Sequence, residues 1–237
     1  MLSPQGRVIM VSGANRGIGL AVARALHAKG YTLSLGARDP AKLEAATRDL
    51  GSERLFRAAF DARDLASGEA WVRGTAERWG RIDGLVNNAA IALDVAIEDE
   101  DESAYDAMWE INVKGPLRLI RLALPHLRRA GSGRIVNIAS LSGKRVKNDK
   151  AGYAMSKFAV MALTHAARRA GWADGVRATA LCPGFVATDM TQWVTDFPRE
   201  SMTQPEDLAE LVATVLALPN NAAIAELLVN CRFEEML

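Results

Sequence analysis

The sequence predicts an α/β fold in which about seven parallel strands form a doubly wound sheet with helices on both faces. Short apolar runs alternate with longer segments of helical period along the 237 residues, as in repeated right-handed βαβ units. Runs such as "IVNIA" at 135–139 are apolar almost throughout, as are strands covered on both faces. No linker, repeat or break in composition divides the chain, so we expect a single domain over residues 1–237.

The expected strands are short aliphatic runs bounded by turn residues, and the expected helices are the segments of helical period between them. The strands lie at 7–13, 32–37, 54–60, 82–89, 133–140, 176–184 and 225–230. The helices lie near 17–29, 40–50, 64–79, 103–130, 151–171 and 205–217. Within 103–130, Pro116 or Pro125 is expected to kink the helix, because each removes a helix hydrogen bond.

Charge and composition argue against several classes of partner. The chain carries 29 Lys and Arg against 28 Asp and Glu, so its net charge of +1 favours neither nucleic acid nor an anionic membrane. The N-terminal run "MLSPQGRVIMVSG" lacks the layout of a signal peptide, and the two cysteines do not form a disulfide framework, so we expect a cytoplasmic protein. The three histidines are scattered, and the acidic run 94–106 lacks calcium-loop spacing and is expected to be a solvated loop. We therefore predict no metal site.

A glycine-rich turn, "SGANRGIG" at 12–19, joins the first strand to the first helix. Gly13, Gly17 and Gly19 allow the backbone to turn tightly and to approach a phosphate closely, and a helix N-terminus supplies amide donors. The spacing G-x3-G-x-G differs from the common G-x-G-x-x-G, but its position between strand and helix predicts a dinucleotide site.

The residues after the second strand predict which dinucleotide binds. NAD readers often place a carboxylate there to hold the ribose hydroxyls, whereas this chain has Arg38, with Arg16 inside the glycine turn. Two guanidiniums suit a 2′-phosphate, so NADP(H) is expected in preference to NAD(H). Asp39 argues for NAD(H) instead, because a small shift in register would put its carboxylate at the ribose. NAD(H) therefore stays possible.

Tyr153 and Lys157 lie one helical turn apart in "YAMSK", after Ser140 at the end of an apolar strand. Taken alone, the pair has two interpretations. It is either an ordinary surface pair or a phenol whose pKa, about 10 in a free side chain, is lowered by the nearby ammonium. Ala154, Met155 and Ser156 between them are expected to be spacers.

Six motifs in order resemble those of short-chain dehydrogenases/reductases: "SGANRGIG", "NNAA" at 87–90, "INVKG" at 111–115, "IVNIAS" at 135–140, "YAMSK" at 153–157 and "CPGFVAT" at 182–188. The resemblance covers roughly residues 7–230. It implies a single Rossmann-type domain that transfers a hydride between a nicotinamide cofactor and a carbonyl or alcohol, and that assembles as a homodimer or homotetramer. Ser12 in place of threonine, Ala90 in place of glycine and the lack of a "VDGG" ending are departures from the family pattern.

The resemblance also implies roles for individual residues. Asn112 would hold a water-linked proton relay, Ser140 would bind the substrate oxygen, and Tyr153 would be the general acid and base. Lys157 would bind the nicotinamide ribose and lower the pKa of Tyr153. Asp61 and Ala62 would contact the adenine, and Asn88 would lie near the adenosine ribose. The implied cofactor-binding set is Gly13, Asn15, Arg16, Gly17, Ile18, Gly19, Arg38, Asp61, Ala62, Asn88, Tyr153, Lys157, Pro183, Gly184, Val186 and Thr188.

Two segments are expected to border the substrate. Residues 189–204 would cover it, and Met190, Trp193, Phe197 and Met202 would either give this cover an apolar face or pack on the protein itself. The loop "LSGKRVKNDK" at 141–150 is expected to be a solvated basic loop, and an anionic substrate is the alternative. We expect a modest-sized ketone or aldehyde with apolar or aromatic substituents.

Three other functions stay open. A 3-oxoacyl-thioester reductase of the acyl carrier protein type would use the same four residues. An NAD-dependent alcohol dehydrogenase would overturn the argument from Arg38. A non-catalytic NADP-binding regulator belongs to a different class, and the intact set of Asn112, Ser140, Tyr153 and Lys157 argues against it.

Overall fold

A computed structural model describes residues 1–234, and these residues form a seven-stranded sheet in which every pair of neighbouring strands is parallel. The strands are β1 (Val8–Ser12), β2 (Thr32–Ala37), β3 (Leu55–Ala59), β4 (Gly84–Asn87), β5 (Arg134–Ile138), β6 (Arg177–Pro183) and β7 (Glu226–Val229). Their order is β3-β2-β1-β4-β5-β6-β7. The prediction of a doubly wound, Rossmann-type α/β fold is confirmed. Between β1 and β4 the strand order reverses, and ligands bind at such a point.

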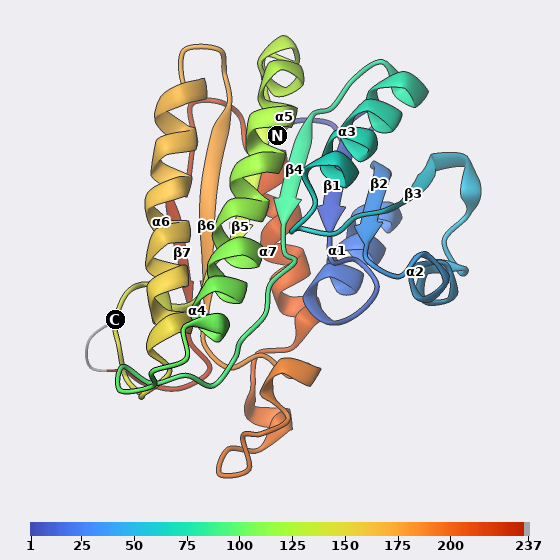
Figure 1. The fold of residues 1–237 in the computed structure, drawn as a ribbon. Helices are drawn as coiled ribbons and strands as arrows, with labels where there is room; N and C mark the ends of the chain where they lie inside the picture. Colours follow the sequence, from blue (N-terminus) through green and yellow to red (C-terminus); the bar gives the residue numbers. More distant parts are fainter. Residues whose placement is uncertain (235–237) are drawn as a thin grey trace.

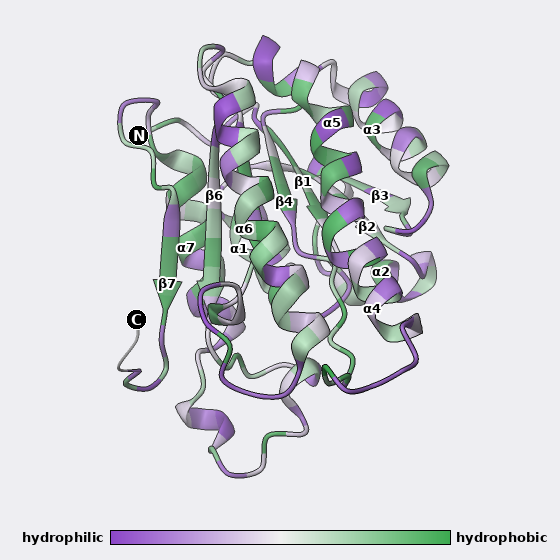
Figure 2. Ribbon diagram, turned by 60° about the vertical axis from the view of Figure 1, so that its left-hand side comes forward, coloured by the Kyte–Doolittle hydropathy of each residue, from purple (hydrophilic) through white to green (hydrophobic). Residues whose placement is uncertain are grey.

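Helices cover both faces of the sheet (Figure 1). They are α1 (Gly17–Ala28), α2 (Pro40–Thr47), α3 (Leu65–Trp79), α4 (Ser103–Met108), α5 (Gly115–Arg129), α6 (Ala151–Gly171) and α7 (Pro205–Ala217). Side chains along each strand alternate between two cores. Ile9 and Val11 pack with α1 and α7, whereas Met10 packs with α3 and α5 on the other face. Figure 2 shows hydrophobic residues along β6 and α7, as expected for buried elements.

The long helical pattern at 103–130 is interrupted, but not by a simple proline kink. Helix α4 passes through a π-helical stretch, Trp109–Lys114, before α5 begins. Pro116 lies in the first turn of α5, whereas Pro125 is accommodated inside it. Because Pro116 has no N–H, it cannot donate to the carbonyl of Asn112 four residues earlier. The irregular stretch therefore lies where the sequence places a candidate catalytic residue, as π-bulges often do.

Other boundaries differ from the expectations by at most a few residues, and the helices at 151–171 and 205–217 match them. Within residues 1–234, none of the helices combines the length and apolar character that a bilayer crossing needs. The same residues hold no group of three or more His, Cys, Asp or Glu side chains placed to bind a metal ion. Residues 235–237 of the expected single domain lie outside the described part of the chain. That residues 1–237 form a single domain stays a prediction.

Candidate active site

The glycine turn lies at the carboxyl end of β1, beside the end of β4. Gly13 and Gly17 adopt positive φ angles of 66° and 52°, which favour glycine. A Cβ on Gly19 would collide with the Gly13 carbonyl oxygen and approach the Asn88 side chain to 2.5 Å. Asn15 and Ile18 are half-buried in the turn and the first turn of α1. The turn is therefore a cradle with room for backbone alone, which fits the close approach of a pyrophosphate.

Asn88 and Ser12 fix this cradle to β4. The Ser12 hydroxyl accepts hydrogen bonds from the backbone N–H groups of Asn88 and Ala89, at 3.0 and 3.1 Å. The Asn88 side chain donates to the carbonyls of Ser12 and Gly13, at 3.1 and 3.2 Å. The hydroxyl that serine retains in place of the family's threonine is therefore used. Asn88 holds the turn itself, in addition to the role near the ribose that the resemblance implies.

The glycine turn also contacts the loop after β6. A Cβ on Gly17 would lie 3.3 Å from the Thr188 side chain, so the two segments touch. Next to this contact, the exposed Arg16 guanidinium pairs with Asp189 at 2.9 Å. Sequence reasoning did not expect this ion pair, which joins the cofactor cradle to the substrate-covering segment.

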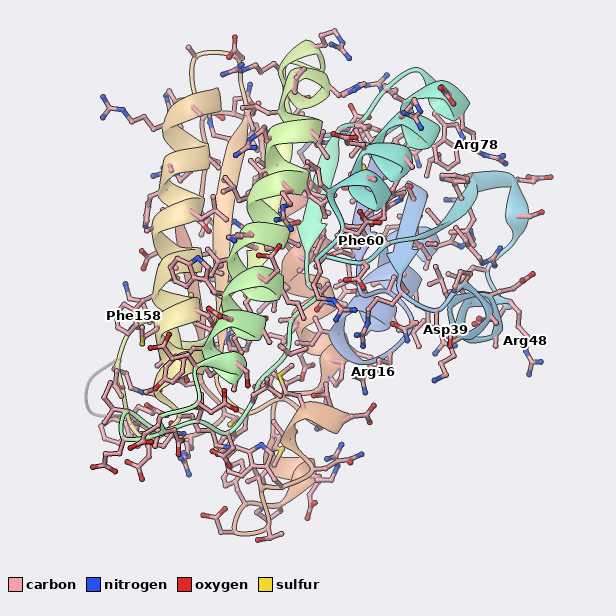
Figure 3. The ribbon with its side chains drawn as sticks, viewed as in Figure 1. Arg16, Asp39, Arg48, Phe60, Arg78 and Phe158 are labelled. Atoms are coloured by element: carbon pink, nitrogen blue, oxygen red, sulfur yellow. The ribbon has the colours of Figure 1, made fainter. Side chains whose placement is uncertain are left out.

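Arg38 is exposed directly after β2. The neighbouring Asp39 is the N-cap of α2, where its carboxylate accepts a hydrogen bond from the Lys42 backbone N–H at 3.0 Å. That hydrogen bond lowers the pKa of Asp39. Figure 3 shows Arg16 and Asp39 beyond the carboxyl ends of β1 and β2. The carboxylate that argued for NAD(H) thus has a structural task in capping a helix.

Asp61 and Ala62 follow β3 at the same edge. The Arg63 guanidinium binds the Asp61 carboxylate, with Nη2 2.7 Å from Oδ2 and Nε 3.1 Å from Oδ1. The hydrogen bond from Arg63 is the main reason that the pKa of Asp61 is lowered. Ala62 is buried against Gly115, where a Cβ would lie 2.8 Å from that of Ala62. An adenine contact through Asp61 would therefore be shared with Arg63.

Asn112 is buried in the π-helical stretch, and its side chain is fully engaged. Its Oδ1 accepts from the backbone N–H of Ile91 at 2.9 Å, and its Nδ2 donates to the Ile91 carbonyl at 2.9 Å. The same Nδ2 donates to Ser156 Oγ at 3.0 Å, and Ser156 in turn donates to the Tyr153 carbonyl at 2.8 Å. Ser156 was expected to be a spacer. That expectation was wrong, because its hydroxyl ties Asn112 to the helix that carries Tyr153 and Lys157.

Ser140 and Tyr153 come together at the ends of β5 and the start of α6. Ser140 begins a short 3-10 helix, Leu141–Gly143, and its Oγ accepts from the Ser142 backbone N–H at 3.1 Å. Burial raises the pKa of the Tyr153 phenol, and the nearby Ser140 hydroxyl opposes that rise. The phenol is thus protonated at neutral pH and already lies against a second hydroxyl.

Lys157 is buried one turn after Tyr153 and points toward β5. Its Nζ donates to the Ile138 carbonyl at 2.9 Å and lies 5.6 Å from the centre of the Tyr153 ring. Burial lowers the pKa of Lys157 to about 8, so the ammonium form still dominates at pH 7. The lowering of the Tyr153 pKa by Lys157, which the resemblance implies, stays a prediction.

The loop after β6 completes the edge. Gly184 donates from its backbone N–H to the Val229 carbonyl at 2.9 Å, and Val186 is buried and forms an isolated bridge with Thr203. Pro183 ends β6 beside β7. In the substrate-covering segment, Met202 is buried against the body, whereas Met190 and Trp193 are exposed. Met202 therefore packs on the protein itself, and a role of the exposed side chains in covering the substrate stays a prediction.

Acidic residues pair with every lysine and arginine of the basic loop. Lys144 pairs with Glu226 at 2.7 Å, Arg145 and Lys147 pair with Glu234, and Lys150 Nζ lies 3.4 Å from Asp94. Residues 146–149 are exposed, as expected of a solvated loop, but the charges of the loop are paired with carboxylates of the protein. The individual residues gave no signal of this, since their partners lie far away in the sequence.

A buried chain of side-chain hydrogen bonds, here called the amide ladder, links Asn87, Asn137 and Thr164 next to the site. Asn87 Nδ2 donates to Asn137 Oδ1 at 2.8 Å, and Asn137 Nδ2 donates to Thr164 Oγ1 at 2.8 Å. The ladder joins β4, β5 and α6. Asn88 directly follows β4, Ser140 lies two residues after β5, and Tyr153 lies in α6. Polar side chains within apolar strands were the only sequence signal of the ladder.

Known proteins with similar sequences belong to the family that the motifs and the site geometry indicate. A family model described as short chain dehydrogenase matches residues 7–198. An agropine synthesis reductase of Rhizobium rhizogenes is 46% identical over 233 residues, which are 98% of this chain and 54% of the relative. A second is 46% identical over 96% of this chain and 53% of its own length, so the chain spans about half the length of these curated relatives. An uncharacterized oxidoreductase of Staphylococcus saprophyticus is 33% identical over 97% of this chain and 99% of its own.

Solved structures show the same fold. The alcohol dehydrogenase of the archaeon Thermococcus sibiricus, complexed with 5-hydroxy-NADP, has a TM-score of 0.88 and 31% identity, covering 97% of this chain and 98% of that one. A 3-ketoacyl-(acyl-carrier-protein) reductase of Brucella melitensis, complexed with NADH, has a TM-score of 0.89 and 27% identity over the same shares. From its motifs, its sheet and these matches, the chain belongs to the short-chain dehydrogenase/reductase family of oxidoreductases.

Proposed function

We propose that this enzyme transfers a hydride between NADP(H) and a carbonyl or alcohol substrate, with Asn112, Ser140, Tyr153 and Lys157 as its catalytic set. The observation that carries the proposal is the placement of Tyr153 near Ser140, beside a glycine cradle and one helical turn before the buried Lys157. The nicotinamide, when bound, supplies or accepts the hydride. The side chains must then manage the charge and the proton on the substrate oxygen.

Tyr153 is the proposed proton donor in carbonyl reduction. When the carbonyl carbon accepts a hydride, its oxygen becomes negative and needs a proton and a hydrogen-bond donor. The raised pKa of Tyr153 keeps the phenol protonated at pH 7, so it can give that proton. Ser140 offers a second donor to the same oxygen. In the reverse direction Tyr153 would have to be deprotonated first, so alcohol oxidation should speed up as pH rises.

Lys157 and Asn112 are proposed to help return a proton to Tyr153 after it has given its own to the substrate. The ammonium of Lys157 stabilises a phenolate nearby, and its pKa of about 8 lets it exchange protons near neutral pH. The Asn112 side chain is held by Ile91 and Ser156, and Pro116 cannot donate a hydrogen bond to the backbone carbonyl of Asn112. That carbonyl is a suitable acceptor for a water in the relay.

The preference for NADP(H) is supported by two exposed arginines at the edge where the ribose phosphate would bind. Arg16 lies in the glycine turn (Figure 3), and Arg38 directly follows β2. Capping of α2 occupies Asp39, which removes the main argument for NAD(H). The Thermococcus enzyme, 31% identical, is complexed with an NADP derivative, whereas the Brucella enzyme is complexed with NADH. We therefore expect NADPH to be favoured and NADH to be used more weakly.

A neutral carbonyl compound with apolar or aromatic substituents is the proposed substrate. Phe185, Trp193 and Phe197 form an aromatic cluster around the loop after β6, with ring centres 6.2 Å apart in each contact with Phe185. Neutralisation of the basic loop argues against an anionic substrate and against an acidic carrier protein. The relatives at 46% identity are named as reductases, which supports the reducing direction. A cytoplasmic homodimer or homotetramer stays our prediction for the assembled enzyme.

The test is a panel of ketones, aldehydes, alcohols and acetoacetyl thioesters, assayed with both NADPH and NADH. We expect turnover of a neutral carbonyl with NADPH. Tyr153→Phe should lower kcat by about 10²–10⁴-fold and should change the Kd for NADPH far less than kcat. Tyr31→Phe is the matched control, because it removes a buried phenol far from the site. Absence of turnover across the panel, or an active Tyr153→Phe enzyme, would refute the proposal.

A further inference from the structure

The C-terminal tail, residues 231–234, leaves β7 at the edge of the sheet where the candidate catalytic residues lie. β7 pairs with β6, and the Val229 carbonyl accepts a hydrogen bond from Gly184. A Cβ on Gly184 would lie 3.3 Å from the Leu141 side chain and 4.0 Å from Cys231 Sγ. Leu141 directly follows Ser140, so the tail begins next to the substrate side of the site.

Glu234 fastens the tail to the loop after Ser140. Its two carboxylate oxygens accept hydrogen bonds from Nε and Nη2 of Arg145, both at 2.7 Å, and Lys147 Nζ lies 3.7 Å away. The side chains of Glu234 and Arg145 are only 6% and 10% exposed. Such a buried, bidentate pair is geometrically specific, and either partner left alone would be an uncompensated charge.

Arg232 fastens the same tail to the other side of the site. Its guanidinium lies 5.0 Å from the centre of the Phe185 ring and 5.7 Å from that of Phe197, within the range of cation–π attraction. Phe185 belongs to the loop after β6 and Phe197 to the substrate-covering segment. Lys150 Nζ stacks over Trp193 of the same segment at 3.9 Å. Through Glu234 and Arg232, the tail therefore contacts both borders of the expected substrate pocket.

We propose that residues 231–234 form a clasp that closes the substrate side of the active site, with Glu234 and Arg232 as positioning residues. Glu234 fixes Arg145 in the loop that follows Ser140, and Arg232 fixes the aromatic cluster at the border of the expected substrate pocket. The clasp lies in the C-terminal stretch that lacks the "VDGG" ending of the family, and we expect it to set the substrate range. Its effect on substrate range rests on the proposed carbonyl reductase activity, whereas the closure itself does not.

Hydrogen–deuterium exchange of the full chain tests the closure without any substrate. Glu234→Gln should accelerate exchange in both 141–150 and 185–204, because one substitution releases both borders. Glu234→Asp keeps the charge and should largely retain protection. Glu210→Gln is the matched control, since Glu210 pairs with Lys29 in an exposed contact elsewhere. Arg232→Gln, at an exposed position, should accelerate exchange in 185–204 even if Glu234→Gln fails to fold.

Steady-state kinetics with the carbonyl of highest kcat/KM in the panel tests the positioning. Glu234→Gln should raise the KM for that carbonyl about tenfold, with kcat and the KM for NADPH within about twofold of the wild-type values. Exchange rates equal to those of Glu210→Gln, or equal rises in KM for the carbonyl and for NADPH, would overturn the proposal. Failure of the whole panel would overturn the proposed function alone, because the exchange comparison would still decide whether the clasp exists.

Discussion

Replacing Asp189 by asparagine is expected to tighten the binding of NADPH and to leave the binding of NADH unchanged. Asp189 holds the Arg16 guanidinium at 2.9 Å. The same guanidinium is proposed to bind the 2′-phosphate, which NADH lacks. Arg16 must therefore leave Asp189, or share its hydrogen bonds, when NADPH binds. Removing the charge of Asp189 removes this competition, while the amide keeps the size of the side chain.

The size of the effect follows from the exposure of the pair. The side chains of Arg16 and Asp189 are 67% and 55% exposed. Ion pairs this exposed contribute about 0.2–1 kcal/mol, which corresponds to a change in Kd of roughly 1.4- to 5-fold. The gain should shrink as salt is added, because salt screens exposed charges.

The assay is a fluorescence titration of the free enzyme with NADPH and with NADH. Asp196→Asn is the matched control, because it removes the charge of another exposed aspartate in the same segment. Arg16→Ala should weaken NADPH binding and should abolish the effect of adding Asp189→Asn. An unchanged Kd for NADPH in Asp189→Asn, or an equal gain for NADH, would refute the assignment of Arg16 to the 2′-phosphate.

Three further outcomes are expected. Because the pKa of Lys157 is about 8 rather than 10.5, the unfolded chain binds more protons than the folded chain between these pH values. The free energy of unfolding of the wild type should therefore rise by up to about 3 kcal/mol, relative to that of Lys157→Met, as pH increases from 8 to 10.5. Urea denaturation measures this, and parallel pH curves for the two proteins would contradict it. Gly19→Ala should destabilise the protein by about 1–3 kcal/mol and weaken NADPH binding, whereas Gly51→Ala, whose Cβ would meet nothing within 4 Å, should leave the Tm and NADPH binding nearly unchanged. Ser156→Ala should lower kcat by roughly tenfold at most without changing the Kd for NADPH, since it releases Asn112 from α6; an unchanged kcat would mean that Ile91 alone positions Asn112.

Regular elements could be predicted from the sequence because their signals are local. The helices at 151–171 and 205–217 have an uninterrupted period and match the structure. The break at 109–114 was anticipated only as a proline kink. Whether Pro116 produces a kink or a π-helical stretch depends on what holds Asn112, and its partners Ile91 and Ser156 lie elsewhere in the chain.

The cofactor side of the site was easier to predict than the substrate side for the same reason. The glycine turn needs only the residues of one strand, turn and helix to be recognised. The ion pairs around the site join residues 173 positions apart for Arg16 and Asp189 and 89 apart for Arg145 and Glu234. The charged residues of a loop do not indicate which distant carboxylates will pack against it, so the ion pairs of the basic loop could not be predicted.

If the proposed function is correct, the distribution of charge would let one protein select a phosphate-bearing cofactor and a neutral substrate. On the ribose side, Arg38 is exposed and Arg16 is held by an exposed carboxylate, so a phosphate can compete for both guanidiniums. On the substrate side, Arg145 is buried against Glu234, and displacing that carboxylate would leave it without a partner in a poorly solvated place. An anionic substrate would have to meet that cost, whereas a neutral carbonyl would not. Selectivity for the substrate would then come from the aromatic cluster and the clasp, and selectivity for the cofactor from the two arginines.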